Sequence, residues 1–174
     1  MNKKIFYLGP KMSFSYNVAI SFASKLRNYE LHECKDFNDL YSNIKNNNYV
    51  VIPYKNSKIG YVHNDLYKKY DFDIIDDIKL EIIFYIAYSG NIQNCKKLYV
   101  NDIAYKECKD HLPNFMKNYD IVFTNSNSLS SIKCKNDNNS SCITNKTSLD
   151  YYKLNTLQKI NIPNNFTYFQ IVTN

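Results

Sequence analysis

At 174 residues with 44% hydrophobic content, the chain can bury one substantial core or two small lobes that share a cleft, and it is too short for a large multi-domain enzyme. The formal net charge of +6 favours anionic partners, either small di-acids or nucleic acids. Because the basic residues are scattered among acidic ones without a dense block or a recognisable motif, nucleic-acid binding is not expected. No apolar run is long enough to span a bilayer, so no membrane partner is expected either.

The five cysteines show neither a CxxC pair nor a Cys/His ligand spacing. This pattern predicts reduced thiols in a cytoplasmic protein, with no metal and no other cofactor. The cysteines are Cys34, Cys95, Cys108, Cys134 and Cys142.

In the first half of the chain, apolar runs of strand length alternate with stretches of helical period, which is typical of an α/β chain. Strands are predicted at residues 5–8, 30–34 and 49–52, and a further helix at 66–71. Ser13 or Ser15 is expected to cap a helix after the first strand, and Asp36 a helix after the second. Pro53 is expected to end the third strand and to leave the next residues in a loop at its carboxyl end, where open α/β sheets bind ligands.

In the second half, residues 74–88 form an extended apolar stretch that is expected to cross out of the first lobe. Further elements follow in the same alternating pattern, with residues 136–141 predicted as a mobile polar loop. The predicted strands are 98–100, 121–123, 142–144 and 166–172; the predicted helices are 104–112, 126–132 and 148–152; residues 157–162 lead back to the first lobe.

Three segments contain candidate functional residues: Gly9 to Ser15, Pro53 to Gly60, and Asn165 to Phe169. Each has an ordinary structural interpretation, because serine and asparagine commonly cap helices or form turns and threonine is common in strands. His32, His63 and His111 form no recognisable triad or ligand set. No single segment therefore establishes a chemistry.

Taken together, the three segments resemble the prephenate dehydratase family in order and spacing. The family patterns read roughly Gly-Pro-x-Gly-Thr-Phe-Ser, Pro-x-Glu-Asn-Ser-x-x-Gly-x-Val and Asn-Phe-Thr-Arg-Phe. The matching residues are Gly9, Pro10, Phe14, Ser15, Pro53, Asn56, Ser57, Gly60, Val62, Asn165, Phe166, Thr167 and Phe169. Met12 replaces a glycine, and Ser13 replaces a threonine with its hydroxyl kept. Weaker correspondence at residues 98–112 and at Asn125-Ser126 extends the resemblance over nearly the whole chain, without the regulatory ACT domain or the chorismate mutase domain.

The resemblance implies two α/β lobes with mixed sheets, similar to a type II periplasmic-binding-protein fold, and a substrate cleft between the lobes. The first lobe would take residues 1–78 and 160–174, and the second residues 79–159. The implied activity is the decarboxylative dehydration of prephenate, a small dianion, to phenylpyruvate in phenylalanine biosynthesis. A homodimer is the implied assembly.

By the same resemblance, Thr167 would help the ring hydroxyl of prephenate to leave. The implied substrate-binding residues are Ser13, Ser15, Lys55, Asn56, Ser57, Ser126, Phe166, Tyr168 and Phe169. Two of them depart from the family pattern, because Lys55 stands where glutamate is expected and Tyr168 where arginine is expected. Losing arginine removes a guanidinium that can donate two hydrogen bonds to one carboxylate, and Lys55 is a candidate to replace it as the carboxylate partner.

Two alternatives stay open at the level of sequence. A prephenate decarboxylase of a bacilysin-like antibiotic pathway would keep the ring hydroxyl, although retention of Thr167 argues against that outcome. A non-catalytic protein that binds a small anion is the other alternative, since fold alone does not establish activity.

Overall fold

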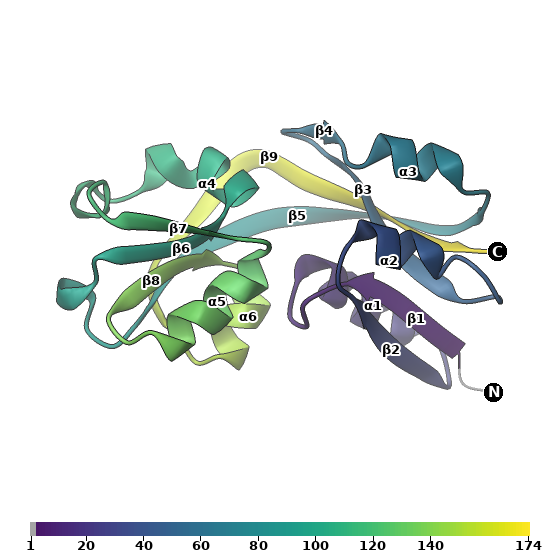
Figure 1. The fold of residues 1–174 in the computed structure, drawn as a ribbon, viewed down its shortest axis with the longest axis horizontal. Helices are drawn as coiled ribbons and strands as arrows, with labels where there is room; N and C mark the ends of the chain where they lie inside the picture. Colours follow the sequence, from purple (N-terminus) through teal and green to yellow (C-terminus); the bar gives the residue numbers. More distant parts are fainter. Residues whose placement is uncertain (1–2) are drawn as a thin grey trace. The chain divides into compact units, whose positions relative to one another are not determined.

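A computed structural model describes residues 3–174, which divide into two compact units. Unit 1 comprises Met1–Ile82 and Asn164–Asn174, and unit 2 comprises Ile83–Pro163. The chain passes between the units in two long strands, β5 (Asp73–Ser89) and β9 (Asn155–Thr173), drawn in teal and yellow in Figure 1.

Unit 1 contains a mixed sheet with the strand order β2-β1-β3-β9, and β4 pairs with β3. The strands β1, β2 and β3 run parallel, whereas β9 is antiparallel to β3. The elements of this unit other than β5 and β9 are β1 (Lys3–Leu8), α1 (Phe14–Ala23), β2 (Tyr29–Cys34), α2 (Phe37–Ser42), β3 (Tyr49–Asn56), β4 (Gly60–Tyr61) and α3 (Asn64–Lys69).

Two helices of unit 1, α1 and α2, begin at residues whose side chains cap them. The Ser13 hydroxyl accepts from the backbone N–H of Tyr16 at 3.2 Å, and the Asp36 carboxylate accepts from that of Asp39 at 2.8 Å. Both caps were predicted from the sequence, with Ser15 as the alternative to Ser13. Since Ser15 lies in the first turn of α1, Ser13 is the cap.

Alternate residues of the central strands enter two apolar clusters of unit 1. Val51 packs in a cluster with residues of α1, whereas Val50 and Ile52 pack in a cluster with residues of α2. On β9, Phe169 and Ile171 belong to the first cluster and Val172 to the second. The two faces of the β3–β9 pair are therefore distinct.

Unit 2 has the strand order β5-β8-β6-β7, with β8 antiparallel to β5 and parallel to β6. Its core cluster includes Ala87, Tyr99, Cys134, Cys142, Leu149 and Leu154. Its elements other than β5 and β9 are the 3-10 turns η1 (Ile92–Asn94), η2 (Lys109–His111) and η3 (Asn114–Met116), the strands β6 (Lys97–Asn101), β7 (Asp120–Thr124) and β8 (Ser140–Thr144), and the helices α4 (Asp102–Cys108), α5 (Asn127–Asn136) and α6 (Lys146–Tyr151).

Two predictions about local structure are wrong. Pro53 does not end β3, which continues to Asn56 with a register shift against β9 between Pro53 and Lys55. Proline is tolerated there because the pairing of β3 with β1 stops at Val51, so the missing N–H removes no bond of that ladder. The loop predicted at residues 136–141 is only a turn of residues 137–139, since α5 continues to Asn136 and β8 begins at Ser140.

The five cysteines are buried as free thiols. Burial raises the pKa of the Cys34 thiol to about 12 and that of the Cys108 thiol to about 12, so both stay protonated at neutral pH. Within residues 3–174, no helix is long and apolar enough to cross a membrane.

Candidate active site

Asn56 on β3 and Thr167 on β9 form a cross-strand pair in unit 1. The Asn56 Nδ2 atom donates to the Thr167 Oγ1 atom at 3.0 Å, across a separation of 111 residues in the chain. Asn56 is buried, with 7% of its surface exposed, while Thr167 is half-buried. The pair therefore presents a hydroxyl group at a partly accessible position.

The turn after β3 fixes the orientation of the Asn56 amide. Its Oδ1 atom accepts from the backbone N–H groups of Lys58, at 2.8 Å, and Ile59, at 3.3 Å, so its NH2 group faces Thr167. Gly60 completes this turn with a φ of +82°, a conformation that favours glycine. Local turn geometry thus positions the donor.

The Thr167 hydroxyl is left with a proton to donate. A threonine hydroxyl offers one donor and two acceptor sites, and Asn56 occupies an acceptor site. Among the described residues, none accepts the Thr167 proton. The arrangement can therefore donate a hydrogen bond from Oγ1 to a bound molecule.

Ser57 holds the end of β3 to the strand that carries Thr167. Its hydroxyl donates to the Asn164 carbonyl at 2.8 Å and accepts from the Phe166 N–H at 2.9 Å, and its own N–H donates to the Phe166 carbonyl at 2.8 Å. The Ser57 hydroxyl proton is thus committed within the protein. This side chain stabilises the backbone on which Thr167 lies.

The segment before α1 uses its polar groups internally as well. The Ser13 hydroxyl donates to the Leu8 carbonyl at 2.9 Å, and the Glu33 carboxylate accepts from the Lys11 N–H at 2.8 Å. A Cβ atom on Gly9 would meet the Glu33 side chain at 2.3 Å, so glycine is required for this close approach. Ser15, which is 6% exposed, makes no side-chain hydrogen bond within the described part of the chain.

Lys55 and Tyr168 form the neighbouring cross-strand pair, and they lie on the opposite face from Asn56 and Thr167, because successive side chains of a strand alternate. The Lys55 ammonium lies over the Tyr168 ring, 5.7 Å from its centroid, and 5.4 Å from that of Tyr61. The predicted loop position of Lys55 is therefore wrong, since Lys55 belongs to β3 and pairs with Tyr168.

Lys79 on β5 is a functional candidate that the sequence did not indicate. Its ammonium lies 3.9 Å from the centroid of the Phe166 ring and 5.9 Å from that of Tyr168. Phe166 thus stacks against a cation, whereas Phe169 is 1% exposed within the core of unit 1 and offers no surface to a ligand. A lysine within a strand that alternates apolar and charged residues gives no local indication of its partner, so only the tertiary structure reveals this contact.

Ser126, the remaining candidate, belongs to unit 2, where it caps α5 by accepting from the Leu129 N–H at 3.1 Å. It stands at the edge of a buried hydroxyl network. Thr124 Oγ1 and Ser130 Oγ lie 2.7 Å apart, and Thr124 Oγ1 donates to the Ser126 carbonyl at 2.9 Å. Ser131 and Thr144 hydrogen bond to each other through their hydroxyls, and both are fully buried.

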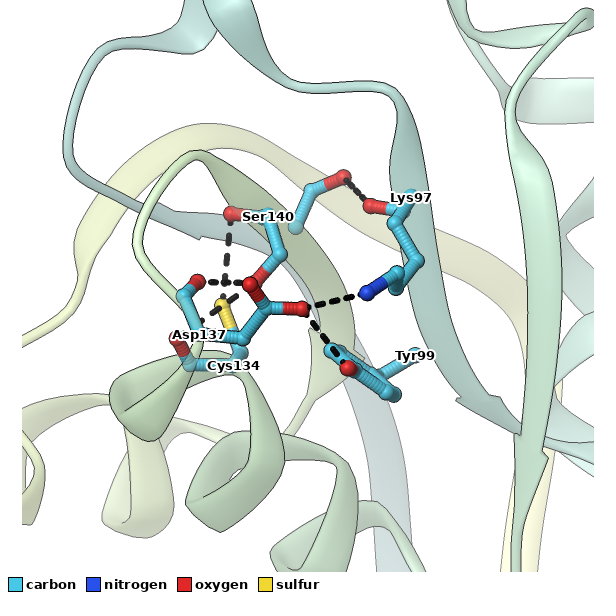
Figure 2. A network of polar contacts seen from close by, with 6 residues as sticks. Lys97, Tyr99, Cys134, Asp137 and Ser140 are labelled. Atoms are coloured by element: carbon cyan, nitrogen blue, oxygen red, sulfur yellow. Dashed lines mark hydrogen bonds and ion pairs between the residues drawn. The ribbon is translucent and has the colours of Figure 1, made fainter.

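A second polar network of unit 2 joins the end of α5 to β6, as Figure 2 shows. Lys97 Nζ and Tyr99 Oη each lie 2.7 Å from Asp137 Oδ2, and Ser140 Oγ donates to the Asp137 carbonyl at 2.6 Å. The bonds from Lys97 and Tyr99 lower the pKa of the Asp137 carboxyl below its usual value. Among residues 3–174, no group of three His, Cys, Asp or Glu side chains is placed to hold a metal ion.

A family model for prephenate dehydratase matches residues 5–174. A bifunctional chorismate mutase/prephenate dehydratase from Aquifex aeolicus is 25% identical over 177 residues. That alignment covers 97% of this chain and 48% of the relative, so the chain spans about half the length of the curated relative it matches.

Solved structures show the same fold. A prephenate dehydratase from Arthrobacter aurescens, in complex with L-Phe, aligns with a TM-score of 0.82 at 18% identity, over 98% of this chain and 60% of that one. An ABC transporter from Parabacteroides distasonis aligns with a TM-score of 0.58 at 13% identity, over 99% of this chain and 65% of that one. The predicted fold class, α/β and similar to periplasmic binding proteins, is confirmed.

Proposed function

Since the chain belongs to the prephenate dehydratase family, we propose that it converts prephenate to phenylpyruvate, carbon dioxide and water, as a lyase of phenylalanine biosynthesis. In this reaction the bond between the ring and its carboxylate breaks, and the electron pair enters the ring. The carbon–oxygen bond of the ring hydroxyl breaks in turn, and the hydroxyl leaves as water after gaining a proton. Aromatisation drives the step, so the protein needs to orient the dianion and to assist the departing oxygen.

The observation that carries the proposal is the hydrogen bond from Asn56 Nδ2 to Thr167 Oγ1. Because Asn56 supplies a donor, the Thr167 proton points away from the amide and is available to the leaving hydroxyl. A hydroxyl held in this way can stabilise the negative charge that develops on the leaving oxygen in the transition state. We assign Thr167 as the catalytic residue and Asn56 as the residue that orients it.

The role proposed for each of the candidate serines depends on whether its hydroxyl proton is already accepted within the protein. Ser13 and Ser57 donate to backbone carbonyls and are assigned to shaping the backbone. Ser15 and Ser126 have hydroxyl protons that no described residue accepts, and we propose that they orient the substrate. The φ of +70° at Met12 supports the family assignment, because the left-handed conformation suits the glycine of the family pattern.

Product analysis of purified protein incubated with prephenate at neutral pH tests this function. Phenylpyruvate formed by the native chain and by Thr167→Ser, but not by Thr167→Val, is the expected result, since serine keeps the hydroxyl that valine removes. A decarboxylated product that retains the ring hydroxyl would assign the chain to the decarboxylases instead. No product above the spontaneous rate would favour a non-catalytic protein that binds a small anion.

We further propose that the chain acts as a homodimer in the cytoplasm. Family membership supports the assembly, and the five buried free thiols fit a reducing compartment. Light scattering at several protein concentrations would measure the mass, and a mass equal to that of the 174-residue monomer at all of them would contradict the dimer.

A further inference from the structure

We propose that Lys55 and Tyr168 form a positioning pair which replaces a cross-strand ion pair, so that the two departures from the family pattern are a single coupled change. This inference rests on the proposed function, in which Asn56 and Thr167 act together. The two residues are direct partners in the register of β3 and β9. The family pattern has glutamate and arginine at these two positions, and a carboxylate opposite a guanidinium on one sheet face would pair.

In this chain a cation and an aromatic ring take the places of the two charges. The Lys55 ammonium is 5.7 Å from the Tyr168 centroid, within the range in which a cation is attracted to a ring face. Both side chains are half-buried, which strengthens such a contact relative to an exposed one. Changing only one family residue would have left a carboxylate facing a phenol or two cations facing each other.

The pair stands next to the catalytic pair on each strand. Lys55 precedes Asn56, and Tyr168 follows Thr167, immediately beyond the register shift between Pro53 and Lys55. A register shift locally disrupts the ladder of backbone hydrogen bonds, so a cross-strand side-chain contact beside it helps to fix the alignment of the two strands. We infer that the contact keeps the Asn56 amide opposite the Thr167 hydroxyl.

Lys79 determines which substitutions the pair tolerates. Its ammonium is also within 5.9 Å of the Tyr168 centroid, so an arginine at position 168 would meet two positive side chains. A glutamate at position 55 would face the introduced arginine across the two strands and could pair with it. The double variant with Lys55→Glu and Tyr168→Arg should therefore be more active and more stable than the single variant Tyr168→Arg.

This role differs from carboxylate binding by Lys55, and steady-state kinetics separate the two. If Lys55 is a positioning residue, Lys55→Met should lower kcat about tenfold and change KM less than about twofold. Misplacement of the Asn56 amide and the Thr167 hydroxyl would weaken the stabilisation of the transition state and leave substrate binding nearly unchanged. Lys55→Arg and Tyr168→Phe should retain activity, since each keeps a cation over a ring. Lys68→Met, at an exposed position of α3, is the matched control. A tenfold rise in KM with kcat unchanged would overturn the inference and make Lys55 a substrate ligand.

The decisive experiment is a double-mutant cycle with Tyr168→Arg, Lys55→Glu and the double variant. Tyr168→Arg should be the least active and the least stable, and adding Lys55→Glu should recover at least about fivefold in kcat. Additive effects of the two substitutions would overturn the coupling.

Two readouts without turnover keep this inference separate from the proposed function. The midpoint of urea unfolding measures the coupling, and the chemical shift of the Asn56 side-chain amide measures its position. If the native chain makes no phenylpyruvate but the midpoints are non-additive and the Asn56 amide shifts in Lys55→Met, the dehydratase assignment fails while the positioning pair stands. An Asn56 amide unmoved by Lys55→Met, with additive midpoints, overturns the pair regardless of activity.

Discussion

Thr167 in unit 1 and the buried hydroxyl network of unit 2 differ in how their hydroxyl groups are bonded. On β9 of unit 1, Thr167 accepts from Asn56 and has a proton that none of the described residues accepts. In unit 2, Thr124, Ser131 and Thr144 are buried and bonded to one another or to backbone carbonyls. An uncommitted, partly accessible hydroxyl can serve chemistry, whereas a committed, buried one serves stability. This difference is open to test, one substitution at a time.

The largest expected effect is on turnover by Thr167→Val. Loss of the donor should lower kcat by about 10²- to 10⁴-fold, the usual contribution of proton donation in a transition state. The free energy of unfolding should change by only about 1 kcal/mol, because the side-chain shape is kept and one hydrogen bond is lost. Stopped product assays and urea unfolding measure the two quantities. A large loss of stability with turnover intact would place Thr167 with the structural hydroxyls of unit 2.

Asn56→Asp is expected to lower kcat by about 10²-fold, close to the loss expected for Thr167→Val. A carboxylate still accepts from the N–H groups of Lys58 and Ile59, but it accepts from Thr167 instead of donating to it. The hydroxyl proton would then be captured within the protein. Asn56→Gln is the control for changes in side-chain length. Full activity in the aspartate variant would show that the direction of this hydrogen bond is irrelevant.

Thr144→Val should act on stability and not on chemistry. Removing this hydroxyl takes away the hydroxyl partner of the buried Ser131, which keeps the Asn127 carbonyl at 3.3 Å, and should cost about 1–3 kcal/mol of unfolding free energy. The kcat of the folded protein should be unchanged. Calorimetry with parallel kinetics checks both, and Ser131→Ala in the same background should recover part of the loss. If kcat falls while the melting temperature stays constant, the contrast between the two units is wrong.

Asp137→Asn should have the smallest effect, and that effect should depend on pH. The pKa of the Asp137 carboxyl is lowered in the folded chain by Lys97 and Tyr99, so its contribution to stability is present above the unfolded pKa of about 3.9. The contribution is lost as pH falls through the folded pKa. Melting temperatures of the native chain and the variant should therefore differ at pH 7 and converge in acid. A constant difference at every pH would mean that the ionised carboxylate is not the stabilising form.

Much of the candidate site was predictable from residues that lie close together in the chain. Ser13 and Asp36 cap their helices through bonds to residues three positions on, so a short pattern is sufficient to predict them. Gly60 has the positive φ that its place in a turn suggests. The prediction of Thr167 and Asn56 as site residues came from family resemblance, and it stays a prediction until turnover is measured.

Other features of the site depended on pairing between distant segments. The sequence pattern placed Lys55 in a loop, because proline usually ends a strand that is paired on both sides. The strand continues past Pro53 because β1 no longer pairs with β3 there, which no local pattern could show. Lys79 contacts Phe166 because the first part of β5 and the motif on β9 both belong to unit 1, although they lie far apart in the chain.

By itself, the sequence determined the α/β alternation, the helix caps and the family, because periodicity, capping and motif spacing are properties of short or ordered stretches of chain. Only the tertiary structure decided that Asn56 faces Thr167 and that Lys55 faces Tyr168. These pairings join segments more than 100 residues apart, and a slip of β9 by one residue would move Thr167 to the face of the sheet opposite Asn56.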